Sequence, residues 1–150
     1  MPALQFKKAT DTEQFFSVYK SCLHHHIDAV FGWDEAFQRD LFATSYEADW
    51  LYWIYRDGVR VGMVCFKAVE DAFHVHLLLI FPSFQRQKLG LLSMEKIHKL
   101  AREEKRHRVT LSSFRRNQDA LTFYQKLGYT IIEEEEHFVS MTCRLNTRIS

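Results

Sequence analysis

The sequence lacks the features that would place it in several common classes of protein. No apolar stretch reaches the length of a membrane-spanning helix, and the N-terminus shows no basic segment followed by an apolar one. The formal net charge is only +1, which gives no reason to expect nucleic acid or a membrane as a partner. Cys22, Cys65 and Cys143 are odd in number and show neither close pairing nor the spacing of a metal site. We therefore expect a cytoplasmic protein with reduced thiols.

The length and the aromatic content indicate one well-packed domain. A chain of 150 residues is long enough to bury a proper core, so we expect a single domain over residues 1–150. Thirteen Phe, six Tyr and three Trp suggest a thick core or a lined pocket.

The segment from Leu77 to Leu100 has the pattern of a buried strand, a polar turn and an amphipathic helix. The apolar run 77–81 is the strand, and Pro82 ends it because proline has no N–H to donate. Residues 85–90 form the turn, and the apolar residues that follow fall close to helical spacing. A turn that opens a helix exposes unpaired backbone N–H groups at the positive end of the helix dipole. The segment therefore predicts a phosphate site.

The other strands and helices are predicted from the periodicity of apolar residues and from the turn and capping residues between them. We expect strands near 3–8, 51–55, 61–66, 73–81, 108–112, 129–132 and 138–145, with helices after residue 10 and over 34–46 and 117–127. Thr10 to Glu13 has capping-box spacing, and Asp57-Gly58 is a hairpin signal. Trp33, Phe37 and Leu41, at steps of four, supply the apolar stripe of the second helix. The order is an α+β pattern with one βαβ crossover around the 77–100 segment.

Two motifs in this order are similar to those of the GCN5-related N-acetyltransferase (GNAT) superfamily. Gln85-x-x-Lys88-x-Gly90 follows the buried strand, and about thirty residues later Asn117 opens a helix that contains Tyr124 and ends in Leu-Gly-Tyr. Superfamily members carry Gln/Arg-x-x-Gly-x-Gly/Ala after the fourth strand, and an Asn followed by a helix with a phenolic Tyr. The resemblance covers roughly residues 50–145 well, and the N-terminal third by element order. It implies an α+β fold with a mixed, mostly antiparallel sheet of about seven strands, flanked by four helices and splayed at strands 4 and 5.

The resemblance also implies an activity and a cosubstrate. Its members transfer the acetyl group of acetyl-coenzyme A to a primary amine, which attacks the thioester directly in a ternary complex. Lys88 stands where the family usually has its first glycine; it adds charge near phosphate but loses backbone freedom. The resemblance implies that coenzyme A is bound by Leu78, Leu79, Ile80, Gln85, Arg86, Gln87, Lys88, Leu89, Gly90, Leu91, Asn117 and Tyr124. It also implies that the backbone N–H groups of Leu78 to Ile80 stabilise the acyl oxygen.

Three residues are candidates for the proton transfers. Tyr124 matches the tyrosine that protonates the departing thiolate in the family; the alternative is a tyrosine packed between helix and sheet. His74 lies eleven positions before Gln85, where the family often has a glutamate base, and His76 lies on the same face of the strand. Histidine titrates near neutral pH, which suits a base, although a strand histidine is more often structural.

The acceptor and other partners are less constrained by the sequence. Trp33, Asp34 and Glu35 combine an aromatic ring with carboxylates where the family's first two helices border the substrate groove, which suits a cationic amine. The alternative is that Trp33 and Phe37 pack in the core and the acids are solvated. We expect no metal, since three consecutive histidines (24–26) on a helix point three ways. The near-neutral charge balance of the chain argues against a nucleic-acid binder that would use Arg115, Arg116 and Lys105 to Arg108. Whether the protein forms a homodimer stays open.

An alternative hypothesis is that the protein has the fold of the family but does not catalyse acetyl transfer. Lys88 and the missing strand glutamate favour a non-catalytic module that binds acyl-coenzyme A or regulates, whereas Tyr124 and Asn117 favour an enzyme. An enzyme would release free thiol in the presence of an amine, and a binding module would not.

Overall fold

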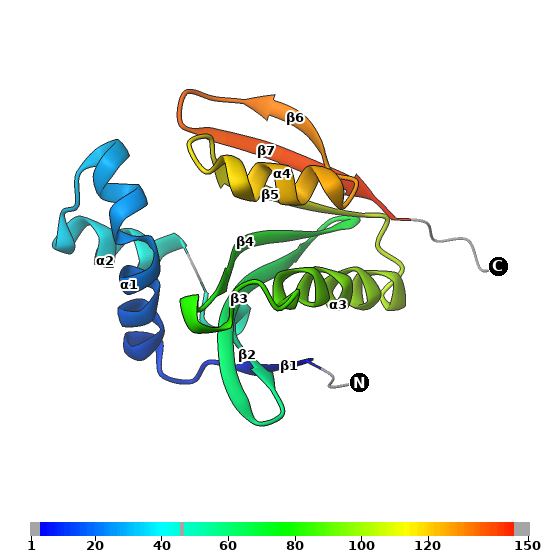
Figure 1. The fold of residues 1–150 in the computed structure, drawn as a ribbon, viewed down its shortest axis with the longest axis horizontal. Helices are drawn as coiled ribbons and strands as arrows, with labels where there is room; N and C mark the ends of the chain where they lie inside the picture. Colours follow the sequence, from blue (N-terminus) through cyan, green and yellow to red (C-terminus); the bar gives the residue numbers. More distant parts are fainter. Residues whose placement is uncertain (1–3, 46, 146–150) are drawn as a thin grey trace. The chain divides into compact units, whose positions relative to one another are not determined.

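The computed structural model describes residues 4–45 and 47–145. The strands are β1 Leu4–Lys8, β2 Leu51–Arg56, β3 Val59–Val69, β4 Ala72–Ile80, β5 Arg108–Phe114, β6 Thr130–Glu134 and β7 Phe138–Arg144 (Figure 1). The α-helices are α1 Thr12–Phe31, α2 Glu35–Ser45, α3 Leu89–Glu103 and α4 Gln118–Lys126, and two short 3-10 helices are η1 Ala48–Trp50 and η2 Pro82–Phe84. Ala3 and Tyr46, the outer ends of a predicted strand and helix, lie outside the described residues.

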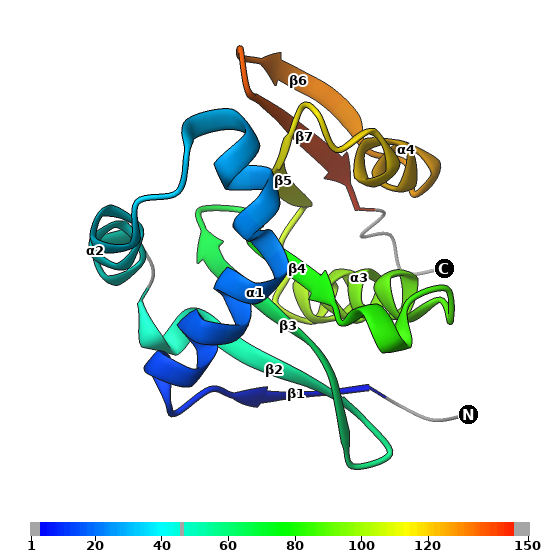
Figure 2. The same cartoon turned by 60° about the vertical axis from the view of Figure 1, so that its left-hand side comes forward.

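The strands form one seven-stranded sheet in the order β1-β2-β3-β4-β5-β7-β6. Parallel pairing occurs between β4 and β5, and β5 with β7 and β6 with β7 pair antiparallel (Figures 1 and 2). The described pairing of β4 with β5 extends only from Ala72 and Arg108 to Val75 and Leu111, although β5 stays paired with β7 as far as Phe114. The α+β fold and the splay at strands 4 and 5 are therefore confirmed.

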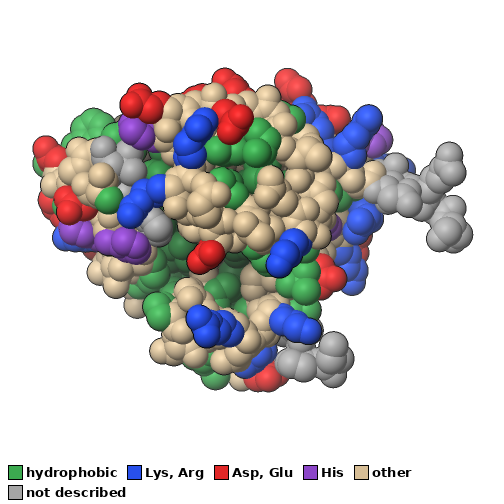
Figure 3. Space-filling model, turned by 45° about the horizontal axis from the view of Figure 1, so that its top comes forward, with side chains coloured by type: hydrophobic (Ala, Val, Ile, Leu, Met, Phe, Trp, Pro, Cys, Tyr) green, Lys and Arg blue, Asp and Glu red, His purple; other side chains and the backbone are tan. Residues whose placement is uncertain are grey.

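The described chain divides into two compact units. The first takes its residues from Met1–Cys65 and Leu77–Gly90, and the second from Phe66–His76 and Leu91–Ser150. None of the described helices is long and apolar enough to cross a membrane. On the face in Figure 3, basic and acidic side chains are interspersed.

In the first unit, local signals set the hairpin and the first helix. Asp57 and Gly58 both have positive φ, 52° and 79°, which is what a two-residue turn between twisted strands requires, so the predicted hairpin is confirmed. Helix α1 is capped by Asp11, whose side chain accepts from the N–H of Gln14, and not by the predicted capping box beginning at Thr10. Phe15 is fully buried in the apolar stripe of α1.

Helix α2 buries a different face from the predicted one. Phe37 and Leu41 are exposed, at 60% and 44%, whereas Gln38 and Phe42 are buried. Phe42 packs against aromatic rings of α1, with a centroid 5.3 Å from that of Phe16. The prediction that Phe37 and Leu41 form the buried stripe was wrong. Helical spacing suits the face of Phe37 and Leu41 as well as the face of Phe42, and contact with α1 buries the face of Phe42.

In the second unit, the ends of α4 were predicted correctly. The Asn117 side chain accepts from the N–H of Ala120, and Gly128 has a φ of 100°, the left-handed value that favours glycine after a helix. Leu121, Val109 and Met141 are buried and contribute to the core of this unit.

Candidate active site

The turn between β4 and α3 is tied to the strands that precede it. The side-chain amide of Gln85 donates to the carbonyl of Ile80 at 2.9 Å, and the N–H of Phe81 donates to the carbonyl of Val61 at 2.9 Å. Arg56, at the end of β2, donates to the side-chain carbonyl of Gln87 at 2.8 Å. Helix α3 begins at Leu89, so Leu89 and Gly90 belong to its first turn and not to the polar turn that was predicted. The turn is thus held by two side-chain amides, with the start of a helix at its end.

Two residues of this turn have left-handed backbone conformations. The φ angles of Arg86 and Lys88 are 65° and 63°, and both side chains are exposed. A non-glycine residue in this region costs roughly 1–2 kcal/mol. The position at which family members carry glycine therefore keeps a glycine-like backbone here, with the lysine side chain exposed and the next residue, Leu89, buried.

The conformation of Lys88 leads to a stability prediction. We expect Lys88→Gly to be more stable than Lys88→Ala by about 1 kcal/mol, because only glycine adopts this φ without steric cost. Lys99 lies inside α3, where the order should reverse, with Ala preferred to Gly by about 1 kcal/mol. Urea unfolding of the four variants measures both differences. Equal stability of the two Lys88 variants would mean that the turn is not left-handed at this residue.

Gly62 on β3 lies against the predicted acyl-oxygen segment, a contact that the sequence analysis missed. A Cβ at this position would collide with the carbonyl oxygen of Leu79, in the 78–80 segment predicted to hold the acyl oxygen. The close approach of the two backbones therefore requires glycine. An isolated glycine within a strand pattern was the available signal.

Tyr124 is buried on α4, within the second unit. Its ring makes an edge contact with that of Tyr129 at a centroid distance of 5.7 Å, and its hydroxyl makes no hydrogen bond to any described residue. Burial raises the pKa of Tyr124 to about 12, so the phenol keeps its proton at neutral pH. The helix that carries it begins at Gln118 and is capped by Asn117, whose side-chain oxygen accepts from the backbone nitrogen of Ala120 at 3.2 Å.

A hydrogen-bonded pair of the half-buried His98 and the buried Tyr129 lies beside Tyr124. Nε2 of His98 is 2.6 Å from the hydroxyl oxygen of Tyr129, and Tyr129 as a whole residue is 2% exposed. Burial and the neighbouring Arg102 lower the pKa of His98 to about 4, and burial raises the pKa of Tyr129. Both residues are thus neutral at pH 7. The sequence analysis missed this pair, since nothing in the local pattern relates residues 31 positions apart.

His74 and His76 share a face of β4, as the alternation predicts. Their ring centroids are 4.6 Å apart, and Nδ1 of His74 is 2.7 Å from the hydroxyl oxygen of Thr110 on β5. Burial, and then the charge of Lys67, lowers the pKa of His74. Burial, His74 and Lys67 lower that of His76 to about 4. Both rings are therefore neutral at pH 7, the form that can accept a proton.

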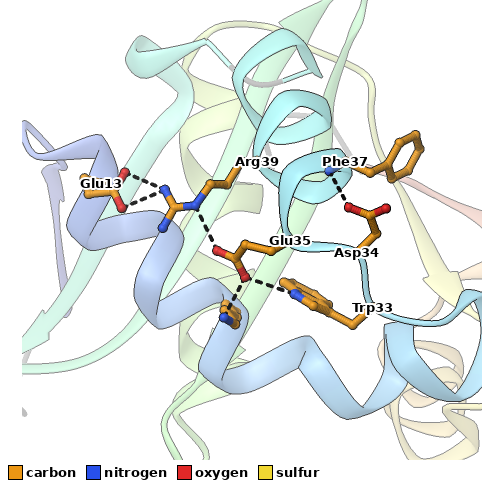
Figure 4. A network of polar contacts seen from close by, with 7 residues as sticks. Glu13, Trp33, Asp34, Glu35, Phe37 and Arg39 are labelled. Carbon is orange, nitrogen blue, oxygen red and sulfur yellow. Dashed lines mark hydrogen bonds and ion pairs between the residues drawn. The ribbon is translucent and has the colours of Figure 1, made fainter.

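Two of the three predicted acceptor residues, Trp33 and Glu35, belong to a polar network between α1 and α2 in the first unit, and Asp34 lies beside it (Figure 4). Glu35 contacts Lys20 at 2.6 Å, accepts from the indole N–H of Trp33 at 3.1 Å and accepts from Arg39 at 2.8 Å. These contacts, with Lys20 first, lower the pKa of Glu35 to about 2. Asp34 accepts from the N–H of Phe37 at the start of α2. A cationic amine would compete for Glu35 with two basic side chains that are already bound.

A pocket of about 310 Å³ lies elsewhere in the first unit. It is lined by Thr12, Glu13, Phe16, Arg39, Phe42, Ala43, Ala48 and Leu51, none of which is a predicted site residue. The ion pair of Glu13 and Arg39, at 2.7 Å, occupies the polar part of its lining. No cluster of His, Cys, Asp and Glu that could hold a metal ion occurs in the part of the chain that the structure describes.

Comparison with known proteins relates most of the chain to one family. Residues 12–129 match the model of the acetyltransferase (GNAT) family. No curated protein matches the chain in sequence.

Solved acetyltransferases have the same fold. The PaiA N-acetyltransferase of Thermoplasma acidophilum, in complex with coenzyme A, superposes with a TM-score of 0.74 at 14% identity, over 95% of this chain and 99% of that one. Ard1 of Thermoplasma volcanium gives 0.69 at 18% identity, over 96% and 99%. The ribosomal-protein-S18-alanine N-acetyltransferase of Escherichia coli gives 0.67 at 18% identity, over 97% and 94%.

Proposed function

Because this chain belongs to the acetyltransferase (GNAT) family, we propose that it transfers the acetyl group of acetyl-coenzyme A to a primary amine. The amine nitrogen attacks the thioester carbonyl directly, so that a C–N bond forms, the C–S bond breaks, and the thiolate leaves. A base takes the proton that the nitrogen loses.

The observation that carries this proposal is the turn at 85–90. It leads into α3, a helix of 15 residues, and it exposes the side chains of Arg86 and Lys88. Backbone N–H groups at a helix start, together with two positive side chains, favour an anionic group such as the pyrophosphate of coenzyme A. Gln85 and Arg56 pre-order the turn through their side-chain hydrogen bonds, which lowers the entropic cost of binding. The N–H groups of Leu78 to Ile80 are our candidates for the acyl oxygen.

Tyr124 is our candidate for the group that assists the leaving thiolate. Its pKa of about 12 lies well above that of an ordinary thiol, roughly 8.5 for cysteine. The phenol therefore keeps its proton and stabilises the thiolate by donating a hydrogen bond. A charge-assisted bond of this kind is stronger than a neutral one.

His74 is our candidate base, since it occupies the position of the family glutamate and is neutral at pH 7. His76 is adjacent on the same face and is the second candidate. Trp33, Asp34 and Glu35 remain candidates for the acceptor side. Glu35 would then act through the network with Lys20 and Arg39.

The rival function is a module that binds acyl-coenzyme A without turnover. Incubation of the protein with acetyl-coenzyme A and a panel of amines, with free thiol measured, distinguishes the two. We expect thiol release that depends on the amine, and an acetylated product detected by mass spectrometry. Coenzyme A binding without release against peptide N-termini, lysine, polyamines and aminoglycosides would favour the rival.

The lowered pKa of His74 predicts the pH dependence of the reaction. A histidine base works only when neutral, so kcat/KM should rise with pH through a transition below the ordinary value of about 6.5 and level off above it. We expect His74→Gln to lower the rate at pH 7 and to remove this transition, and His76→Gln to do less.

The amine's own deprotonation also raises the rate with pH, so the profiles must be compared for amines of different pKa. A transition that moves with the amine belongs to the substrate. If the double variant keeps the wild-type profile, neither histidine is the base.

A further inference from the structure

Hydroxyl side chains continue the row that begins at His74 across the sheet of the second unit. His74 on β4 is paired with Thr110 on β5, Thr110 with Thr142 on β7, and Thr142 with Thr130 on β6. Residues paired in this way lie on the same face of a sheet, with Cβ atoms about 4.5–5.5 Å apart in antiparallel pairs. We call Thr110, Thr142 and Thr130 the hydroxyl row. No charged residue interrupts it among these four positions.

The contact of His74 with Thr110 has two alternative proton arrangements. At 2.7 Å, Thr110 either donates to an unprotonated Nδ1 or accepts from Nδ1–H. In the first arrangement the ring proton is on Nε2, and no lone pair is left for a substrate. In the second, Nε2 carries the lone pair and is free to take a proton.

Thr142 lies next to Thr110 in the hydroxyl row. Its hydroxyl oxygen is buried and has no hydrogen-bond partner among the described residues. A hydroxyl both donates and accepts, so a χ1 rotation of Thr142 or one bridging water would link it to Thr110 in either arrangement. The two arrangements therefore differ in what they leave on His74, and only the second leaves Nε2 with a lone pair for a substrate.

We propose that Thr110 is a positioning residue that holds His74 in the Nδ1–H tautomer through this 2.7 Å contact. Nε2 is then the atom that takes the proton. The N–H bond of the attacking amine breaks, its electrons stay on nitrogen, and the proton joins the Nε2 lone pair to give an imidazolium, which later releases it to solvent. This inference rests on the proposed function for its consequence, but the tautomer is a property of the protein alone.

The tautomer can be measured without substrate. In the free wild-type protein at pH 7.5, we expect the ¹⁵N chemical shifts of His74 to identify a protonated Nδ1 and an unprotonated Nε2. Thr110→Val removes the hydroxyl at almost constant volume and should shift the ring towards Nε2–H, whereas Thr110→Ser should keep the wild-type tautomer. Ser112→Ala is the matched control, because Ser112 lies on the same strand and face but contacts Ser140.

The kinetic consequence separates positioning from general stability. We expect Thr110→Val to lower kcat about fivefold with little change in KM. This is the factor by which one neutral hydrogen bond typically shifts an equilibrium, here the one between the two tautomers of His74. Thr110→Ser and Ser112→Ala should keep near wild-type kcat. A wild-type His74 protonated on Nε2, or a tautomer unchanged in Thr110→Val, would overturn the proposal. A protein that acetylates no amine would refute the proposed function instead, and the ¹⁵N shifts of the wild type would still decide the role of Thr110.

Discussion

Gly90→Glu is expected to abolish coenzyme A binding while the protein stays folded. Gly90 is the second residue of α3, directly after the turn that we assign to the pyrophosphate. A glutamate there adds bulk and a negative charge where phosphate is to bind, and like charges placed together cost several kcal/mol. The dissociation constant measured by calorimetry should rise by more than about 100-fold.

Two control variants separate the causes of this loss. Gly90→Ala adds only a methyl group at a position whose φ is not positive, so we expect it to weaken binding far less. Lys99→Gln changes the net charge by the same amount on the same helix but two turns further on, and it should bind nearly as well as the wild type. Unchanged affinity in Gly90→Glu, with an unchanged circular dichroism spectrum, would place the cosubstrate elsewhere.

Tyr124→Phe should reduce turnover strongly and leave coenzyme A affinity almost unchanged. The change keeps the buried ring and its contact with Tyr129, and it removes only the hydroxyl, which bonds to no described residue. Stability should therefore change little. Removal of one preorganised donor to a developing anion costs on the order of 10²–10³ in kcat. Steady-state kinetics, with the product identified by mass spectrometry, measures the loss.

Tyr129→Phe is the matched control for this experiment. It removes a phenol from the neighbouring ring and breaks the 2.6 Å contact with His98, so it should lower the stability of the protein. We expect its kcat to fall much less than that of Tyr124→Phe. If the two variants lose the same activity, or if Tyr124→Phe keeps wild-type turnover, Tyr124 is a packing residue and another group assists the thiolate.

The features that the sequence determined by itself are local or periodic. Asp57-Gly58 has the left-handed φ values of the predicted hairpin, and Asn117 and Gly128 are at the two ends of α4 as expected. Strand alternation placed His74 and His76 on one face. Each of these depends on neighbours a few residues apart, whose preferences do not need the rest of the fold.

Other features were decided by the tertiary structure, because they depend on residues far apart in the chain. Contact with α1 selected which stripe of α2 is buried, so Phe37 is exposed although helical spacing suited it to the core. The pairing of β4 with β5 brought Thr110 to His74, and burial lowered the pKa of that ring below the value expected for a free histidine. The motif identified residues 85–90 as the candidate cofactor turn, but the folded backbone put Lys88 in a glycine conformation. Burial, charge and hydrogen bonding are sums over spatial neighbours, and only the fold specifies those neighbours.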